Sequence, residues 1–303
     1  MDGIKISVVC PVYNGGEYLK PFLESCIGQQ MKEVEFICVD DGSTDSSAEV
    51  LKEYAEKDKR IKAIFNEHQG VGPTLKTGLK AAAGDYILTC DDDDMLAPNA
   101  LQILYDASEG VADVVKGTAV YEKDSKIWKS NIFKSTEPLD WRRFDGNMLL
   151  AHFLQPPEVW SYIVRRELLP EIESGDYMCG DTDRVFKMKV AAKDFRYIPE
   201  TVYIWRIHES ASHSSRFPFD ILKVYDNLER WLKERNINLW PVFGLSKFYA
   251  YEWNATRLSG DVLERFLDYA RRDLEREVID PGLLRPESKL TFENLMHRPS
   301  PLD

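Results

Sequence analysis

The sequence lacks the segments that would place a chain in a membrane or in a disulfide-bonded fold. Its 303 residues contain no apolar run of about 18 residues and no amino-terminal signal peptide. The five cysteines are an odd number without a Cys-x-x-Cys pair, so we expect reduced, mostly buried thiols and no zinc site. We therefore expect a cytoplasmic protein without a transmembrane segment, and peripheral association at the inner face of the membrane stays open.

Negative charge exceeds positive charge. The chain has 39 Lys and Arg against 51 Asp and Glu, a formal net charge of -12. This balance counts against nucleic acid or an anionic membrane as a partner, because both bind clustered Lys and Arg. With 44% apolar residues the chain can bury a sizeable core, so we expect a globular protein.

Two familiar phosphate-binding signatures are also missing. Gly15 and Gly16 do not form a Gly-x-Gly-x-x-Gly fingerprint, and no Gly-x-x-x-x-Gly-Lys-Ser/Thr loop occurs. We therefore expect a phosphorylated ligand to be neutralised by metal. A nucleotidyltransferase acting on sugar phosphates is the nearest alternative enzyme, but residues 11–16 carry no cation that would bind a triphosphate.

The first part of the chain alternates short apolar strands with amphipathic helices. Four such units with short connections predict a doubly wound α/β arrangement, since each helix can return the chain to a parallel strand. The first strand should end at Pro11, which cannot donate a backbone hydrogen bond. The four strands are expected at residues 5–10, 34–39, 61–65 and 86–89.

Four consecutive acids follow the fourth strand, Asp91, Asp92, Asp93 and Asp94. Unpaired neighbouring carboxylates raise one another's pKa, so the run predicts an oxygen-rich site for a hard divalent cation. Ligand crevices of open α/β sheets lie beyond the carboxyl ends of the strands, where these acids stand. The alternative is a solvated acidic turn that caps the next helix.

The second part of the chain has a different pattern of expected secondary structure. We expect a long strand over residues 112–121, then an irregular polar segment over 122–140. Apolar residues recur at helical spacing after residue 217, and the proline-containing residues 280–303 predict a loosely ordered tail. We divide the chain into a domain at 1–216 and a helical extension at 217–303. The helices of the extension could pack on a second copy of the chain, so formation of a homo-oligomer stays open.

Three segments resemble glycosyltransferase family 2, and they occur in its order and spacing. The resemblance implies a GT-A fold, which is a Rossmann-like mixed sheet flanked by helices. It also implies inverting transfer of a hexosyl or N-acetylhexosaminyl group from a nucleotide-diphosphate sugar to a carbohydrate or lipid-linked acceptor, in bacterial polysaccharide or glycoconjugate biosynthesis. The segments are Val9-Cys-Pro-Val-Tyr-Asn14, Val39-Asp-Asp-Gly-Ser-Thr-Asp45 and the stretch from Gly84 to Pro98.

The resemblance assigns donor-binding roles to matching residues. Pro11 and Tyr13 match the loop that flanks the base, and Asp41 matches the acid that accepts the N3–H of a uracil-type base. A carboxylate suits that imide and not cytosine, whose N3 is an acceptor. Lys76 stands one position late for a phosphate-side or base-side cation. A packed loop aromatic and an Asx-turn before Gly42 are the alternatives for Tyr13 and Asp41.

The same resemblance makes Asp91-Asp92-Asp93 the Asp-x-Asp motif. Asp93 would bind Mn²⁺ or Mg²⁺, Asp91 would reach the ribose and metal side, and Asp94 would face the sugar, with Asp92 also on the donor side. His208 is a further metal-ligand candidate, for which a hydrogen-bonded imidazole is the alternative.

The catalytic base is expected near residue 183. By resemblance Asp183 is the base, and Asp181 is the second candidate because Thr182 occupies the place of the family's first acid. An ordinary helix cap is the other explanation of Asp183. A non-catalytic nucleotide-sugar-binding module would not need a base, so Asp183 and His208 count against that alternative.

Overall fold

The computed structural model describes residues 3–123, 126–129, 135–154, 158–173, 180–208 and 219–297. The chain forms two compact units. The predicted domain boundary at residue 216 falls in 209–218, outside the described residues, and stays a prediction. The first unit comprises residues 1–143, 157–173 and 187–211, and the second comprises 144–156, 174–186 and 212–303.

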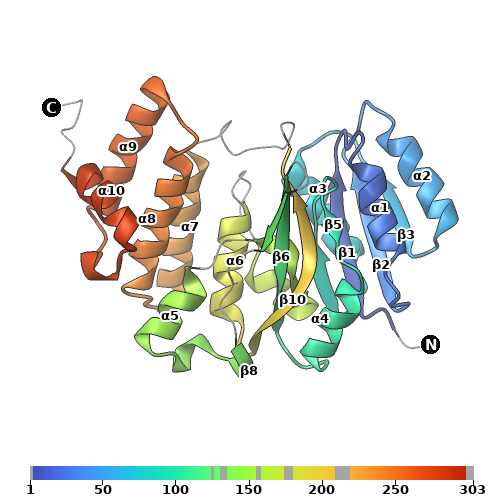
Figure 1. The fold of residues 1–303 in the computed structure, drawn as a ribbon, viewed down its shortest axis with the longest axis horizontal. Coiled ribbons are helices and arrows are strands. Elements are labelled where there is room, and N and C mark those ends of the chain that lie inside the picture. Colours follow the sequence, from blue (N-terminus) through green and yellow to red (C-terminus); the bar gives the residue numbers. More distant parts are fainter. Residues whose placement is uncertain are drawn as a thin grey trace. The chain divides into compact units, whose positions relative to one another are not determined.

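A mixed sheet of ten strands forms the centre of the first unit (Figure 1). The strands are β1 (Ile6–Val12), β2 (Val34–Asp40), β3 (Ile61–Phe65), β4 (Tyr86–Thr89), β5 (Met95–Leu96), β6 (Val114–Lys123), β7 (Lys126–Lys129), β8 (Ser135–Leu139), β9 (Tyr162–Arg165) and β10 (Phe195–Arg206). Their order is β3-β2-β1-β4-β9-β6-β10-β5, with β7 added to β6 and β8 to β10.

Helices of the first unit cover both faces of the sheet. The first unit holds α1 (Leu19–Ile27), α2 (Ser47–Lys57), α3 (Val71–Ala81), α4 (Ala100–Ser108) and the 3-10 turns η1 (Trp141–Arg143), η2 (Val159–Ser161) and η3 (Arg166–Glu171). The second holds α5 (Gly146–Phe153), α7 (Asp220–Glu234), α8 (Val242–Ala255), α9 (Gly260–Leu274), η5 (Pro281–Leu283) and α10 (Pro286–Met296). The division between the units falls inside α6 (Gly180–Ala191), after Phe186.

The order of the first four strands creates the crevice that the sequence predicts. β1 pairs in parallel with β2 on one side and with β4 on the other, so the chain reverses direction across the sheet between them. Ligands of such sheets bind at that switch point, beyond the carboxyl ends of the strands. The loops that follow β1 and β4 therefore lie where a ligand is expected.

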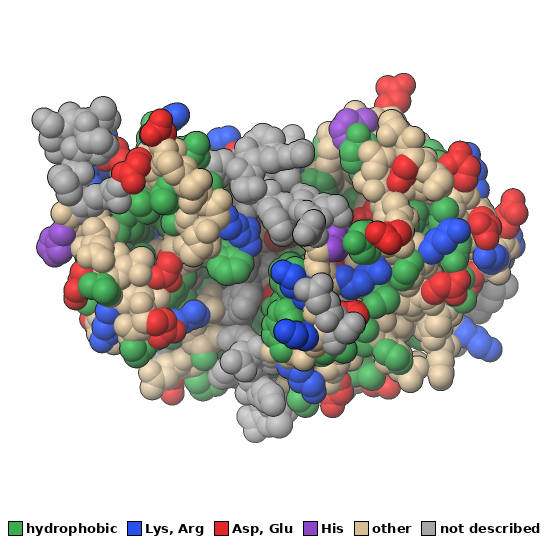
Figure 2. Space-filling model, turned by 45° about the horizontal axis from the view of Figure 1, so that its top comes forward, with side chains coloured by type: hydrophobic (Ala, Val, Ile, Leu, Met, Phe, Trp, Pro, Cys, Tyr) green, Lys and Arg blue, Asp and Glu red, His purple; other side chains and the backbone are tan. Residues whose placement is uncertain are grey.

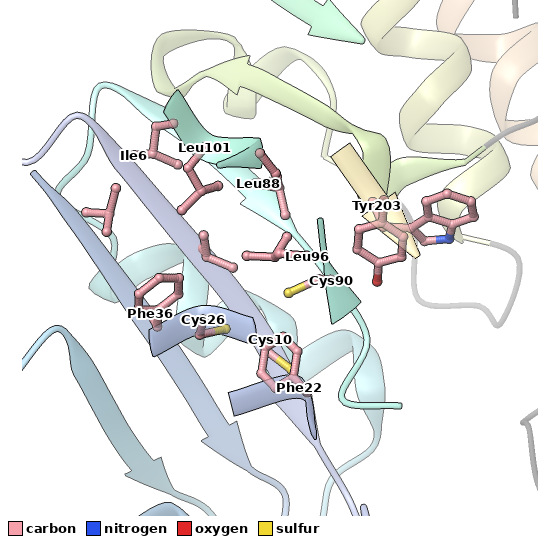
Figure 3. Close-up of a cluster of buried hydrophobic side chains, with 14 of the residues drawn as sticks. Ile6, Cys10, Phe22, Cys26, Phe36, Leu88, Cys90, Leu96, Leu101 and Tyr203 are labelled. Carbon is pink, nitrogen blue, oxygen red and sulfur yellow. The ribbon is translucent and has the colours of Figure 1, made fainter. Parts of the chain in front are cut away.

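Strand periodicity distributes the apolar side chains of β1 between two cores. Val8 and Cys10 join the larger cluster with α1 and α4, while Val9 joins the smaller cluster with α3. The larger cluster reaches Tyr203 beyond Leu96 and Cys90 (Figure 3). The four described cysteines, Cys10, Cys26, Cys38 and Cys90, are buried free thiols, and burial raises their pKa values.

Several sequence expectations need correction. β1 continues through Pro11 to Val12, and its pairing with β4 ends at Val9, before the proline. The segment 122–140 is not wholly irregular, because it contributes β7 and β8. Residues 280–303 include η5 and the helix α10, where Pro286 occupies the first turn and needs no donor.

The surface is mixed in charge. On the face drawn in Figure 2, acidic and basic side chains of the described residues are interspersed and not gathered by sign. Among the described residues, every helix is too short or too polar to cross a membrane.

An ion pair lies buried within the first unit. Lys116 Nζ on β6 is 2.8 Å from Glu158 Oε2 and 2.7 Å from Ser161 Oγ, and all three side chains are buried. Lys189 on α6 is also buried. Burial, with the neighbouring charge of Lys116, lowers the pKa of Lys189 to about 7, while Glu158 opposes the shift. Two buried lysines thus lie near one carboxylate.

We expect Lys189→Met to stabilise the protein. The unfolded chain keeps a lysine pKa near 10.5, so unfolding takes up a proton between about pH 7 and that value, and stability falls as pH falls through this window. Removing the buried charge should raise the free energy of unfolding at pH 7 by about 1–4 kcal/mol. Urea unfolding at pH 7 and above pH 9 measures the effect.

The exposed Lys193 provides the control, since Lys193→Met removes a lysine from the same segment without a buried charge. The difference between wild type and Lys189→Met should shrink as pH rises, and Lys193→Met should follow wild type. A Lys189→Met protein less stable than wild type at pH 7 would contradict this account.

Candidate active site

The acidic loop, Asp91–Asp94, follows β4 at the switch point of the sheet. Carboxylate oxygens of Asp91, Asp93 and Asp94 lie within 4.8 Å of one another. Asp91 is exposed, Asp93 is half-buried and Asp94 is buried. Three carboxylates at this separation repel one another, so the loop must be fixed by other contacts.

Two side chains of β10 fix the acidic loop. Tyr203 donates its hydroxyl to Asp94 Oδ2 at 3.0 Å and accepts the Asp91 N–H at 3.2 Å. Arg206 donates its backbone N–H to Asp94 Oδ1 at 2.8 Å. Its guanidinium donates to the carbonyl oxygens of Asp93, Asp94 and Tyr18, at 2.5, 3.3 and 2.9 Å. The guanidinium of Arg206 therefore fastens the backbone of the loop without occupying the carboxylates of Asp91 or Asp93, whereas both oxygens of Asp94 accept hydrogen bonds from β10.

His208 lies against the same loop. Its Nε2 is 3.1 Å from Asp93 Oδ2. The imidazole stacks on Tyr18 with a centroid separation of 4.0 Å, and the Arg206 guanidinium lies over the same tyrosine ring. The structure thus brings together Asp93 and His208, the two residues that the sequence nominated as metal ligands.

Asp92 turns away from the other three acids. A Cβ on Gly15 would come within 2.7 Å of Asp92 Oδ2, so a side chain at this position would displace the Asp92 carboxylate. That oxygen is buried and has no hydrogen-bond partner among the described residues. Burial, with the charge of Asp93, raises the pKa of Asp92 to about 7. Burial and the charges of Asp91 and Asp93 also raise the pKa of Asp94.

The donor set suits a hard divalent cation. Carboxylate oxygens are the ligands that Mg²⁺ and Mn²⁺ prefer, and an imidazole nitrogen is a common further ligand. Asp91, Asp93 and Asp94 offer the oxygens, and His208 offers Nε2 beside Asp93. A cation bound there would relieve the repulsion that raises the pKa values of the loop.

The loop after β1 and the end of β2 form a second cluster. Asp41 is buried, and its oxygens accept the N–H groups of Gln69 and Gly70, each at 2.9 Å. His68 Nδ1 is 2.9 Å from Asp41 Oδ2. The ring of Tyr13 is 46% exposed and stacks on His68 at 4.3 Å. Sequence spacing gave no role to His68, because its contact with Tyr13 spans two strand-end loops.

Comparison with known protein families identifies the family of the chain. The model described as "Glycosyl transferase family 2" matches residues 7–163. The chain belongs to glycosyltransferase family 2. Glycosyltransferase GlyG of Streptococcus pneumoniae is 40% identical over 243 residues, which cover 73% of this chain and 78% of that protein. The predicted family is confirmed, and the protein is a glycosyltransferase.

Solved structures confirm the predicted GT-A fold. S. aureus TarS 1–349 in complex with UDP-GlcNAc has a TM-score of 0.74 at 20% identity, over 96% of this chain and 87% of that chain. Mannosyltransferase PcManGT of Pyrobaculum calidifontis, solved with GDP-Man and Mn²⁺, has a TM-score of 0.58 at 17% identity, over 96% of this chain and 84% of that one.

Other predicted site residues of this glycosyltransferase have contacts of their own. Pro11 lies within β1, one residue before its end. Lys76 on α3 forms an ion pair with Glu173 Oε1 at 3.2 Å, and both side chains are largely exposed. A phosphate would have to compete with Glu173 for this cation, so the role of Lys76 stays a prediction.

The two candidate bases differ in burial. Asp183 lies in the first turn of α6, is fully buried, and accepts from Asn227 Nδ2 at 3.3 Å within the second unit. Asp181 lies in the same turn and is exposed. Asp181 and Asp183 stand two positions apart on the helix and differ in exposure, so the two acids are not interchangeable, and the choice between them stays a prediction.

We expect Arg206→Lys to loosen the acidic loop. Lysine keeps the positive charge but loses the planar group that reaches three carbonyl oxygens. Charge-assisted hydrogen bonds contribute about 1.5–3 kcal/mol each, so amide hydrogen exchange over residues 91–94 should become faster.

Arg196→Lys is the matched control, because Arg196 lies on the same strand and pairs with Asp194 away from the loop. It should leave exchange at residues 91–94 unchanged. Equal protection of these residues in Arg206→Lys and wild type would remove Arg206 from this role.

Proposed function

We propose that this chain transfers a sugar from a UDP-sugar to an acceptor hydroxyl, with inversion at the anomeric carbon and with Mn²⁺ or Mg²⁺. The acceptor is a carbohydrate or a lipid-linked glycan in polysaccharide or glycoconjugate biosynthesis. The observation that carries the proposal is the group formed by Asp91, Asp93 and Asp94, with His208 at 3.1 Å from Asp93, at the switch point of the sheet. The UDP-GlcNAc bound to TarS and the GDP-Man and Mn²⁺ bound to PcManGT support it.

Uracil recognition is assigned to Tyr13 and Asp41. The exposed ring of Tyr13 offers a face on which the base can stack. A carboxylate has about four acceptor positions. The N–H groups of Gln69 and Gly70 occupy two on Asp41, while His68 Nδ1 lies 3.1 Å from the Asp41 carbonyl oxygen and 2.9 Å from Oδ2. A further position on the carboxylate can accept the imide N–H of uracil.

The diphosphate is assigned to the acidic loop. The divalent cation supplies charge neutralisation for the leaving nucleotide. Asp93 and His208 hold their ligand atoms side by side, and Tyr203 and Arg206 fix the loop backbone, so little reorganisation is needed on binding.

The acceptor step needs a base. In an inverting transfer the acceptor oxygen forms the new bond at the anomeric carbon as the bond to the diphosphate breaks, and the hydroxyl proton must leave. We assign this proton to the carboxylate of Asp183, with Asp181 as the second candidate.

Asp93→Asn should abolish Mn²⁺-dependent binding of UDP. The isosteric change removes one ligand charge and also removes the Asp93 charge that adds to burial in raising the pKa of Asp92, so the metal-free protein should be at least as stable as wild type. Calorimetric titration with UDP, with and without Mn²⁺, provides the measurement. Asp85→Asn, at the opposite end of β4, should bind as wild type does; unchanged affinity in Asp93→Asn would exclude Asp93 from the metal site.

Asp183→Asn should slow transfer and leave UDP affinity near wild type, because the base contacts the acceptor and not the diphosphate. Loss of a general base typically lowers the rate about 10²–10⁴-fold. The transfer rate to an acceptor found by screening is measured beside UDP affinity. Asp181→Asn is the matched variant: a large loss there, with normal transfer in Asp183→Asn, would give the role to Asp181.

A further inference from the structure

A row of five aromatic rings crosses the first unit. Trp128 stacks on Tyr121 with centroids 5.7 Å apart, and Tyr121 meets Trp205 edge to face at 5.0 Å. Trp205 lies 6.0 Å from Trp160, which stacks on Tyr203 at 4.6 Å. The rings come from β6, β7, β10 and η2, so the row depends on the sheet and not on one segment.

The row joins the acidic loop to the surface. At its inner end the Tyr203 hydroxyl donates to Asp94, one of the three clustered acids. At its outer end Trp128 is 45% exposed, and Tyr121 and Trp205 are half-buried. Trp160 and Tyr203 belong to the buried core, whereas Trp128 presents a large ring at the surface next to Tyr121 and Trp205.

Strand register places the three outer rings on one face. Tyr121 on β6 pairs with Trp128 on β7 and with Trp205 on β10, and β6 and β10 lie side by side in Figure 1. Directly paired residues project to the same face of a sheet, so the three rings lie next to one another on one face, with Trp128 stacked on Tyr121 and Trp205 edge-on to it. Ile127 pairs with Glu122 and projects to the opposite face.

The buried ion pair holds this surface in place. Glu158 accepts a short hydrogen bond from the Tyr121 hydroxyl through one oxygen and binds Lys116 through the other. Lys116 also donates to Ser161, the residue after Trp160. A buried ion pair is weak evidence for stability, and in some proteins such a pair serves conformational specificity instead. Here the pair fixes Tyr121 and the turn that carries Trp160.

We propose that Trp128, Tyr121 and Trp205 form a platform on which a sugar ring of the acceptor stacks. The electron-rich faces of aromatic rings attract the C–H face of a pyranose, while the sugar hydroxyls stay in water. A platform fixed before binding also loses little entropy when the sugar arrives. The assignment of this sugar to the acceptor rests on the proposed function, because the row leads to the acidic loop that would hold the donor.

The test uses the full chain without nucleotide or metal, so that it does not depend on the donor site. The indole N–H signals of the tryptophans are followed by NMR during titration with chitotetraose, cellotetraose and maltotetraose, each to about 10 mM, where millimolar affinities are visible. At least one sugar should shift the Trp128 signal saturably. Trp128→Ala should weaken that sugar's binding about tenfold or more, and Trp128→Phe should retain most of it.

Ile127→Ala is the matched control and should bind the sugar as wild type does, since it truncates the neighbouring exposed residue on the other face. The platform is overturned if none of the three sugars shifts the Trp128 signal, or if Trp128→Ala and Ile127→Ala bind equally. Wild-type titration with UDP and Mn²⁺ is read separately. If UDP and Mn²⁺ do not bind, the result counts against the proposed donor site alone. If none of the sugars binds at Trp128, the result counts against the platform alone.

Discussion

Repulsion among the acids of the loop after β4 is the constraint on which the site depends. Tyr203 and Arg206 hold Asp91, Asp93 and Asp94 together through backbone groups and one hydroxyl. Because Arg206 reaches carbonyl oxygens with its guanidinium, the loop is fixed while its carboxylate charge remains for a cation. Burial and repulsion both raise the pKa of Asp94, so the charged form of this side chain is disfavoured when no cation is bound.

The sheet and its buried polar groups hold the rest of the site in relation to this loop. β1 and β4 place the loop beside Tyr13, and β10 supplies the contacts that fix it. The same strand carries Trp205 and Tyr203, so one element joins the acidic loop to the aromatic platform. Donor and acceptor functions would thus share one scaffold, in which a change in β10 affects both.

The sequence predicted the strands and helices whose apolar residues recur at regular spacing. The strand at residues 86–89, its acidic end and the parallel order of the first units follow from apolar runs and short connections. Sequence reasoning treated Asp92 as a member of one acidic cluster, whereas the fold turns this side chain toward Gly15. It also missed β7, a four-residue strand that begins and ends in lysine. The pairing of Lys116 with Glu158 was missed because contacts between distant segments leave no local pattern.

We propose that the acidic loop binds a divalent cation together with a uridine diphosphate. Electron paramagnetic resonance of Mn²⁺ tests it directly, because free and protein-bound ions give different spectra. The account predicts weak Mn²⁺ binding to the protein alone and much tighter binding once UDP is added, since each ligand completes the other's site. The opposite result would be that UDP binds with the same affinity in Mn²⁺ and in excess chelator, and that Mn²⁺ stays free when UDP is bound. That result would exclude a shared site for the cation and the nucleotide.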